Sequence, residues 1–254
     1  MSLNQQAFNG RAANYAKGRP GYPEAVHVFL AEQGVGTGKK VADIGSGTGI
    51  FSKVLLDLGA EVWGVEINDE MRMQAEIDLQ NNHCFHSLSG SAEATGLLDS
   101  SVDFISAAQA FHWFDKEKFQ IESRRILKPG GRIILLWNCE KLDNLLFEEW
   151  GKIQLKWINR RMTTNEKYSP QEFFIEPGRK FLQNCREFRC PNIFYKDKES
   201  FLAQALSSSA APLPADKNYQ RYHDEVNALF DRLQKNGKLV YPCETVVLIG
   251  ETTL

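Results

Sequence analysis

The stretch VADIGSGTGIFS combines one acidic residue with three closely spaced glycines in the pattern D-x-G-x-G-x-G. Asp43 precedes Gly45, Gly47 and Gly49, which separate a strand-like run from a helix-like run. Only glycine lets a backbone turn this tightly and approach another molecule without a steric cost. The following helix would aim its free N–H groups at that molecule. The pattern therefore predicts a ligand site at the first strand-to-helix turn of an open α/β sheet.

A second acidic residue, Glu66, stands at the end of the next strand-like run. A carboxylate at that place suits the two hydroxyls of a ribose. The NAD fingerprint G-x-G-x-x-G does not match, because Ile50 occupies its third glycine position. A P-loop in GVGTGKK also fails, because Gln33 and Lys40 occupy positions that need Gly and Ser or Thr. Glu66 and the glycine loop together predict a ribose-containing ligand of another class.

Three aromatic residues and a histidine stand side by side in QAFHWFD, directly after a strand-like run. Four consecutive side chains cannot all point into one core, so we expect Phe111, Trp113 and Phe114 to divide between helix packing and a pocket wall. His112 could act there as a general base or a hydrogen-bond donor. The alternative is a histidine satisfied by the backbone. Asp115 is expected to cap the next helix.

The N-terminal stretch NYAKGRPGYP places Arg19 directly before Pro20 and close to Pro23. Proline restricts the backbone, and a guanidinium held in one place suits a carboxylate. Two interpretations remain open for Arg19: a carboxylate-binding group and a surface arginine on a loop.

Strand-like apolar runs alternate with helical periodicity through the first half of the chain. This alternation predicts a doubly wound α/β sheet. One predicted helix carries Met71, Ala75 and Leu79 on one stripe, with Asn68 as its cap. Helical patterns predominate in the second half. The strand-like runs are 39–44, 61–67, 83–88, 102–108, 132–137, 185–196 and 244–250.

Composition is that of an ordinary globular protein. The chain has 254 residues, 43% of them hydrophobic, which suits a single domain over 1–254. A net charge of −2 and the lack of a Lys/Arg run give no indication of nucleic-acid binding. No apolar run is long enough to span a bilayer, and MSLNQQAFNG has no leader-like apolar region. Five scattered cysteines without CxxC spacing indicate reduced thiols, so we expect a cytoplasmic protein without a metal or a membrane partner.

Four segments, in this order, resemble the class I S-adenosylmethionine-dependent methyltransferases: VADIGSGTG, GVEIN, GSAEATGLLDSSVDFISAAQAFHWFD and RILKPGGRIILL. FNGRAANYAKGRPGYP and QAFHWFD are similar to the small-molecule branch that includes trans-aconitate methyltransferase-like (methyltransferase type 11) proteins. The resemblance implies S-adenosyl-L-methionine as cofactor and a mostly parallel seven-stranded sheet with an antiparallel last strand and helices on both faces. It does not cover two helical insertions over one sheet edge, at 141–182 and 199–236, where the acceptor would be chosen.

The resemblance also assigns cofactor-binding roles. Segment 1–38 would cover the cofactor, with Tyr15 and Arg19 on its methionine carboxylate, and 39–138 would form the cofactor-binding core. Glu66 would hold the ribose, and Asp43 would support the loop. The other positions would contact the methionine and ribose (Gly45, Ser46, Gly47), the adenine (Ile67, Met71, Ser91, Ala92, Glu93) and the region of the sulfonium (Gln109, Ala110). Many relatives carry Asp where this chain has Ser91, so the adenine contact departs from the family pattern.

The acceptor is expected to be a small molecule that takes the methyl group on a carboxylate or hydroxyl oxygen. A carboxylate needs no base because it is already ionised near neutral pH, whereas a phenol or amine would need one, for which His112 is the best candidate.

Two alternatives to this function remain: a nucleotide-binding oxidoreductase, which Ile50 disfavours, and a regulatory or partner module that binds cofactor without catalysis. The sequence makes no prediction of oligomeric state. Candidate acceptor contacts are Trp113, Arg160, Arg161, Ser208 and Arg221.

Overall fold

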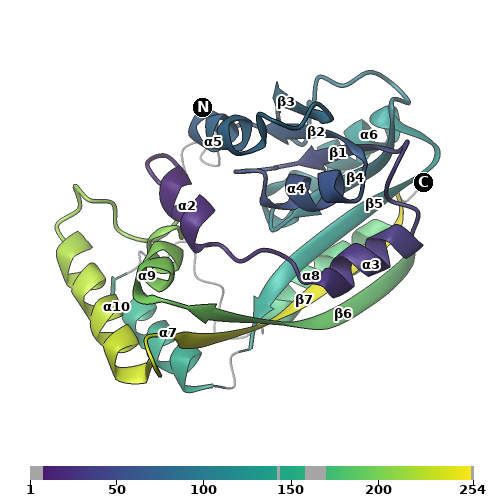
Figure 1. Cartoon of the computed structure of the whole chain (residues 1–254). Helices are drawn as coiled ribbons and strands as arrows, with labels where there is room; N and C mark the ends of the chain where they lie inside the picture. The colour runs from purple at the N-terminus through teal and green to yellow at the C-terminus, as the bar shows by residue number, and fades with distance from the viewer. Residues whose placement is uncertain (1–7, 142–143, 158–169, 253–254) are drawn as a thin grey trace.

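The computed structural model describes residues 8–141, 144–157 and 170–252, which contain a seven-stranded sheet (Figure 1). The strands are β1 (Lys40–Ile44), β2 (Glu61–Glu66), β3 (Phe85–Ser89), β4 (Val102–Ala108), β5 (Leu127–Glu140), β6 (Leu182–Lys196) and β7 (Leu239–Thr252). Their order across the sheet is β3-β2-β1-β4-β5-β7-β6. β7 runs antiparallel to both of its neighbours, whereas the other pairs are parallel. The predicted mostly parallel sheet with an antiparallel last strand is therefore confirmed.

Helices cover both faces of the sheet, as expected. α3 (Glu24–Glu32), α4 (Ile50–Asp57) and α5 (Asp69–Leu79) contribute to the apolar core on one face. α6 (Lys116–Ile126) and α8 (Pro170–Phe181) contribute to the core on the other. Side chains of β1, β4 and β5 alternate between the two cores, because successive strand residues point to opposite faces. Burial on both faces explains why these strands read as nearly continuous apolar runs.

A third apolar core lies beside the end of β6 and the start of β7. α7 (Leu145–Trp157), α9 (Lys198–Leu206) and α10 (Tyr219–Leu233) pack there against Tyr241 of β7. These three helices, here called the helical cap, lie at the lower left of Figure 1, away from β1 to β4. The helices of the segment predicted at 141–182 are thus divided, because α7 joins the cap and α8 covers a sheet face.

A short helix, α2 (Ala12–Gly18), connects the sheet to the cap and lies between α5 and α9 in Figure 1. Just before it, the Gly10 N–H donates to Oε2 of Glu70 on α5 (2.6 Å). The buried guanidinium of Arg11 donates to the carbonyl oxygen of Leu206 on α9 (3.1 Å). The α2 segment is therefore attached to both sides and fixes the cap relative to α5.

Gly18, the last residue of α2, lies so close to α9 that a Cβ would overlap the backbone of Ala203 and Gln204. We expect Gly18→Ala to lower the free energy of unfolding by about 1–3 kcal/mol, the usual cost of overpacking. Gly151, inside α7, is the control, because nothing lies within 4 Å of the place its Cβ would take. Gly151→Ala should be neutral or slightly stabilising through helix propensity. Denaturant unfolding measures both, and equal stability of the two variants would contradict the close contact of α2 with α9.

Candidate active site

The glycine loop between β1 and α4 has the backbone that its sequence predicts. Gly45, Gly47 and Gly49 have φ angles of +66°, +58° and +81°, a region that is strained for other residues. A Cβ on Gly45 would lie 2.7 Å from the Cβ of Ala110, so only glycine lets the loop approach the segment after β4 this closely. The loop and the end of β4 therefore meet at one place, as in other open α/β sheets that bind ligands there.

Asp43 lies beneath this loop and is fully buried. Its two carboxylate oxygens accept hydrogen bonds from the hydroxyls of Ser52 on α4 and Ser106 on β4, each at 2.7 Å. Burial raises the pKa of Asp43 to about 6, although both hydrogen bonds oppose the rise. Asp43 therefore joins β1, α4 and β4 from below and does not line the cavities above the loop.

Glu66, at the end of β2, is held by backbone N–H groups from both sides. Oε2 accepts from the Gly47 N–H (2.9 Å) and Oε1 from the Asn68 N–H (2.8 Å). Burial raises the pKa of Glu66, and these donors oppose that rise by favouring the charged form. The predicted cap is also present, because Asn68 Oδ1 accepts from the Met71 N–H (3.0 Å). Glu66 is therefore fixed against the glycine loop with lone pairs left over for a ligand.

A cavity beside this carboxylate, called the Glu66 cavity, brings together most of the predicted cofactor positions. The Glu93 carboxylate on its wall accepts from the Asp115 N–H (3.0 Å), which ties one of its oxygens to the start of α6. The ring of Phe8 meets that of Trp113 edge-on, 6.1 Å between centres, and narrows the space. The predicted residues that line the cavity are Tyr15, Gly45, Gly47, Glu66, Ile67, Met71, Ser91, Ala92, Glu93, Gln109, Ala110 and Trp113.

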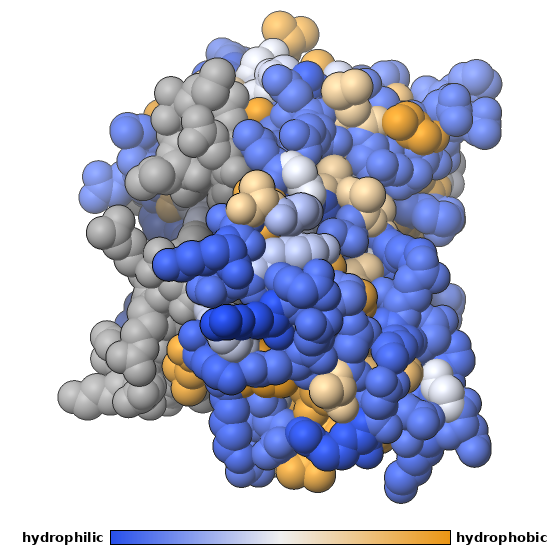
Figure 2. Space-filling model, turned by 90° about the vertical axis from the view of Figure 1, so that its left-hand side faces the viewer, coloured by the Kyte–Doolittle hydropathy of each residue, from blue (hydrophilic) through white to orange (hydrophobic). Residues whose placement is uncertain are grey.

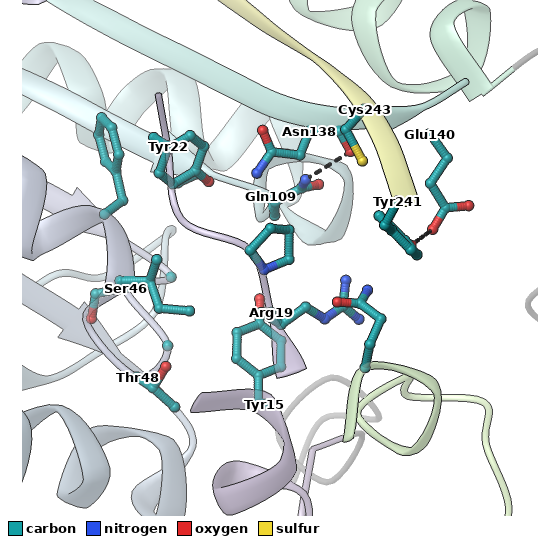
Figure 3. Close-up of a pocket in the computed structure, with 17 residues that line it drawn as sticks. Tyr15, Arg19, Tyr22, Ser46, Thr48, Gln109, Asn138, Glu140, Tyr241 and Cys243 are labelled. Atoms are coloured by element: carbon teal, nitrogen blue, oxygen red, sulfur yellow. Dashed lines mark hydrogen bonds between the residues drawn. The ribbon is translucent and has the colours of Figure 1, made fainter. Parts of the chain in front are cut away.

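A second space, called the Ser46 cavity, opens between the glycine loop and the segment after α2 (Figure 3). Tyr15 and Arg19 line it together, with the guanidinium carbon 4.9 Å from the centre of the tyrosine ring. Arg19 Nε donates to Ser207 Oγ (3.0 Å), which orients the group. Among the described residues, no carboxylate forms an ion pair with Arg19. Arg19 therefore lines a cavity and is held by Ser207, unlike an arginine on an open loop, and its carboxylate-binding role stays a prediction.

A third space, called the tryptophan cavity, lies between the ends of β4 and β5 and the helical cap. Its wall combines aromatic and polar side chains, and Gln109, His112 and Trp113 are the residues of QAFHWFD that line it. Phe111 instead lies in the apolar core, and Phe114 lines the Glu66 cavity. The predicted acceptor contacts Trp113 and Ser208 and the predicted base His112 all line it. The aromatic side chains of its wall include Trp113, Trp137, Trp150 and Phe174.

Three predicted acceptor contacts are not placed at the site. Arg221 is exposed on α10 and does not line the three cavities. Arg160 and Arg161 lie outside the described residues. A helical periodicity alone does not indicate which face of α10 turns toward the cavity.

His112 presents an uncharged ring to the tryptophan cavity. Its Nδ1 is buried and has no hydrogen-bond partner among the described residues. Burial, together with the positive charges of Lys116 and Arg19, lowers the pKa of His112 to about 3. The ring centre lies 4.8 Å from that of Phe174. His112 is therefore a weak base, although its ring nitrogen remains able to hydrogen-bond a ligand.

Gln109 lines all three cavities and has an unusual backbone. Its φ of +56° is rare for a residue other than glycine. The side-chain Nε2 donates to the carbonyl oxygen of Asn138 (3.1 Å), and the N–H donates to that of Leu136 (2.9 Å). Strained backbones persist where their surroundings determine them, and they gather at functional sites. Gln109 thus marks the point at which the three cavities meet.

The structure also adds residues that the sequence analysis missed. Glu140, the last residue of β5, lines both the Ser46 and tryptophan cavities. Its position at the carboxyl end of a parallel strand is a signal that could have identified it. Tyr241 and Gln204 reach the Ser46 cavity from β7 and α9, and no local pattern marks either of them.

The pKa of Asp43 leads to a stability prediction. A carboxyl with a pKa of about 6 when folded and 3.8 when unfolded destabilises the fold as it ionises. Its contribution to the free energy of unfolding should therefore fall by about 3 kcal/mol between about pH 4 and pH 6. Asp43→Asn removes the charge and should remove this decline. Denaturant unfolding over that range compares the two proteins, and parallel curves would contradict the raised pKa.

Comparison with known proteins connects this geometry to a family. A family model described as a methyltransferase domain matches residues 42–135. An uncharacterized methyltransferase of Schizosaccharomyces pombe is 31% identical over 251 residues, covering 97% of this chain and 97% of that protein. An uncharacterized methyltransferase of Mycobacterium tuberculosis is 37% identical over 139 residues, covering 54% of this chain and 53% of that protein. The match thus spans about half the length of the mycobacterial relative and nearly all of the yeast one.

Solved structures share the fold. A putative type II methyltransferase from Anaeromyxobacter dehalogenans superposes with a TM-score of 0.62 at 21% identity, covering 92% of this chain and 97% of that one. An S-adenosylmethionine-dependent methyltransferase from Geobacter sulfurreducens, solved with S-adenosyl-L-homocysteine, superposes with a TM-score of 0.56 at 16% identity, covering 97% and 98%. The domain match and the full-length relative show that the chain belongs to the methyltransferase family, and these solved structures show that it has the class I methyltransferase fold.

Proposed function

We propose that the chain transfers a methyl group from S-adenosyl-L-methionine to a carboxylate or hydroxyl oxygen of a small molecule. The observation that carries the proposal is the junction of three cavities at Gln109. A ribose-suited carboxylate lies on one side of this junction and the tryptophan cavity on the other. Membership of the methyltransferase family supports the reaction type. The narrower trans-aconitate methyltransferase-like branch stays a prediction.

The residues of the Glu66 and Ser46 cavities fit the proposed cofactor. Glu66 is positioned by two backbone N–H groups and keeps acceptor capacity for both ribose hydroxyls. The apolar side chains of Ile67 and Met71 suit the adenine ring, and Ser91 offers a hydroxyl at its edge. At the other end, the guanidinium of Arg19 suits the methionine carboxylate. The cofactor would thus extend from the end of β2, across the glycine loop, to the segment after α2.

When bound, S-adenosyl-L-methionine supplies an electrophilic methyl group on a positively charged sulfur. Because this charge disappears during transfer, the main tasks of the chain are to align the acceptor and to exclude water. Gln109 would border the reacting atoms from its position at the junction. Trp113 lines both the Glu66 and tryptophan cavities and would form a wall shared by cofactor and acceptor.

The dimensions of the site favour a small acceptor. The tryptophan cavity has a volume of about 290 Å³, at the lower end of the range for small-molecule sites.

On the face shown in Figure 2, the described residues are mostly hydrophilic, with small and separate apolar spots. Of the described helices, none is long and apolar enough to cross a membrane. A cytoplasmic location and the absence of nucleic-acid partners stay predictions.

Calorimetric titration with S-adenosyl-L-methionine tests the cofactor first. We expect micromolar binding by the wild-type chain and at least about tenfold weaker binding by Glu66→Ala, because two hydroxyls lose a charged acceptor. Glu61→Ala, at the opposite end of β2, is the control and should bind within about twofold of the wild type.

Two results would contradict the proposed cofactor site: no binding by the folded wild-type chain, or equal losses in the Glu66→Ala and Glu61→Ala variants. Binding without transfer to any acceptor would instead indicate a regulatory or partner module.

A further inference from the structure

Glu140 and Tyr241 form a hydrogen-bonded pair at the wall of the Ser46 cavity (Figure 3). The Tyr241 hydroxyl, on β7, donates to Oε1 of Glu140 at the end of β5. Tyr241 is only 1% exposed, and the antiparallel pairing sets Glu140 opposite Cys243. Glu140 also lines the tryptophan cavity. A carboxylate is therefore held in one place, where the proposed cofactor and acceptor spaces adjoin.

The surroundings of Glu140 make it a stronger base than an exposed glutamate. Loss of hydration raises its pKa, and the Tyr241 hydrogen bond and nearby positive charges oppose only part of that rise. Burial also raises the pKa values of the tyrosine and the thiols that face it, which keeps them uncharged. The facing groups are Tyr241, Cys139 and Cys243, all neutral, and the cations Arg19 and Lys196.

His112 does not compete for this role. Its pKa of about 3 leaves the ring nitrogen a weaker base than an ordinary carboxylate. The strained Gln109 and the neighbouring Asn138 carry amides, which do not accept a proton near neutral pH. Among the described side chains that line the tryptophan cavity, Glu140 is thus the group best suited to accept one.

The tryptophan cavity favours a flat and uncharged acceptor. The half-buried rings of Trp113 and Phe174 line it, and aromatic faces pack well against another ring. A carboxylate acceptor would lie against the charge of Glu140, because Arg19 is already assigned to the methionine carboxylate, and this like charge disfavours binding. An ammonium group could pair with Glu140, but its nitrogen has no lone pair to take a methyl group. A neutral hydroxyl on an aromatic ring avoids the repulsion and offers a proton to Glu140.

We propose that Glu140 is the general base for methyl transfer to the hydroxyl of an aromatic acceptor, an inference that rests on the proposed function and narrows its acceptor. In this step the acceptor O–H bond breaks, its proton passes to Glu140, and the oxygen forms a bond to the methyl carbon. The carbon–sulfur bond breaks and its electron pair stays on sulfur, which loses its positive charge. Glu140 then releases the proton to water.

A pair of probes with the same ring system tests the charge preference: 2-naphthol and 2-naphthoate. Near neutral pH, with the chain saturated with S-adenosyl-L-homocysteine, 2-naphthol should bind at least about tenfold more tightly. Glu140→Gln keeps the size and removes the charge, so 2-naphthoate should bind more tightly and the preference should shrink. Glu244→Gln is the control, because this carboxylate pairs with Arg189 and does not line the three cavities.

Methyl transfer to 2-naphthol gives the kinetic test. Because only the ionised carboxylate accepts a proton, kcat/KM should fall as the pH drops through the pKa of Glu140. Glu140→Gln should lower kcat by at least about 100-fold and remove this fall. Tyr241→Phe removes a donor that favours the ionised form, so the fall should move to higher pH. His112→Asn should retain it, and a purely structural role of Glu140 would not shift the profile in this pattern.

The outcomes separate the two proposals. If the wild-type chain does not bind S-adenosyl-L-methionine, the proposed function itself fails. If it binds the cofactor but neither probe, or prefers 2-naphthoate, the aromatic hydroxyl class is wrong. Transfer to 2-naphthol with kcat unchanged in Glu140→Gln, in a variant that binds cofactor normally, would overturn the assignment of the base.

Discussion

The buried carboxylate of Asp43 holds together the three elements on which the site is built. It stands near the end of β1, directly opposite Ser106 of β4, and accepts hydroxyls from both β4 and α4. Burying a carboxylate is unfavourable, as its raised pKa records. The hydrogen bonds of this carboxylate hold the start of the glycine loop in place, so that Gly45 lies against Ala110 at the end of β4.

The glycine loop and the end of β4 carry or position several of the groups with proposed roles in the reaction. The loop presents the Gly47 N–H to Glu66, and the end of β4 presents Gln109 to all three cavities. α2 then brings Tyr15 and Arg19 across from the other side, attached to α5 and to the cap. The site thus lies between the sheet and the helical cap, with α2 between them (Figure 1).

The sequence predicted the features that depend on neighbouring residues. The loop follows from its glycines, the caps from Asn68 and Asp115, and the parallel sheet from alternating apolar runs. The sequence did not predict contacts between distant segments, because strand periodicity does not indicate which strands pair. Glu140 and Tyr241, 101 positions apart, meet only because β7 lies beside β5. Arg221 shows the converse, since an arginine on an amphipathic helix faces solvent unless the packing of that helix directs it elsewhere.

The separation of the hydrophobic cores bears on how the family diversifies. The cores on the two sheet faces support the loop, Glu66 and the end of β4, whereas the cap has a core of its own. Trp150 of the cap core lines the tryptophan cavity, so a substitution there changes the wall of this cavity without altering the two cores that support the loop. The proposed methyl-donor site can in this way stay unchanged while the cap side of the proposed acceptor site varies.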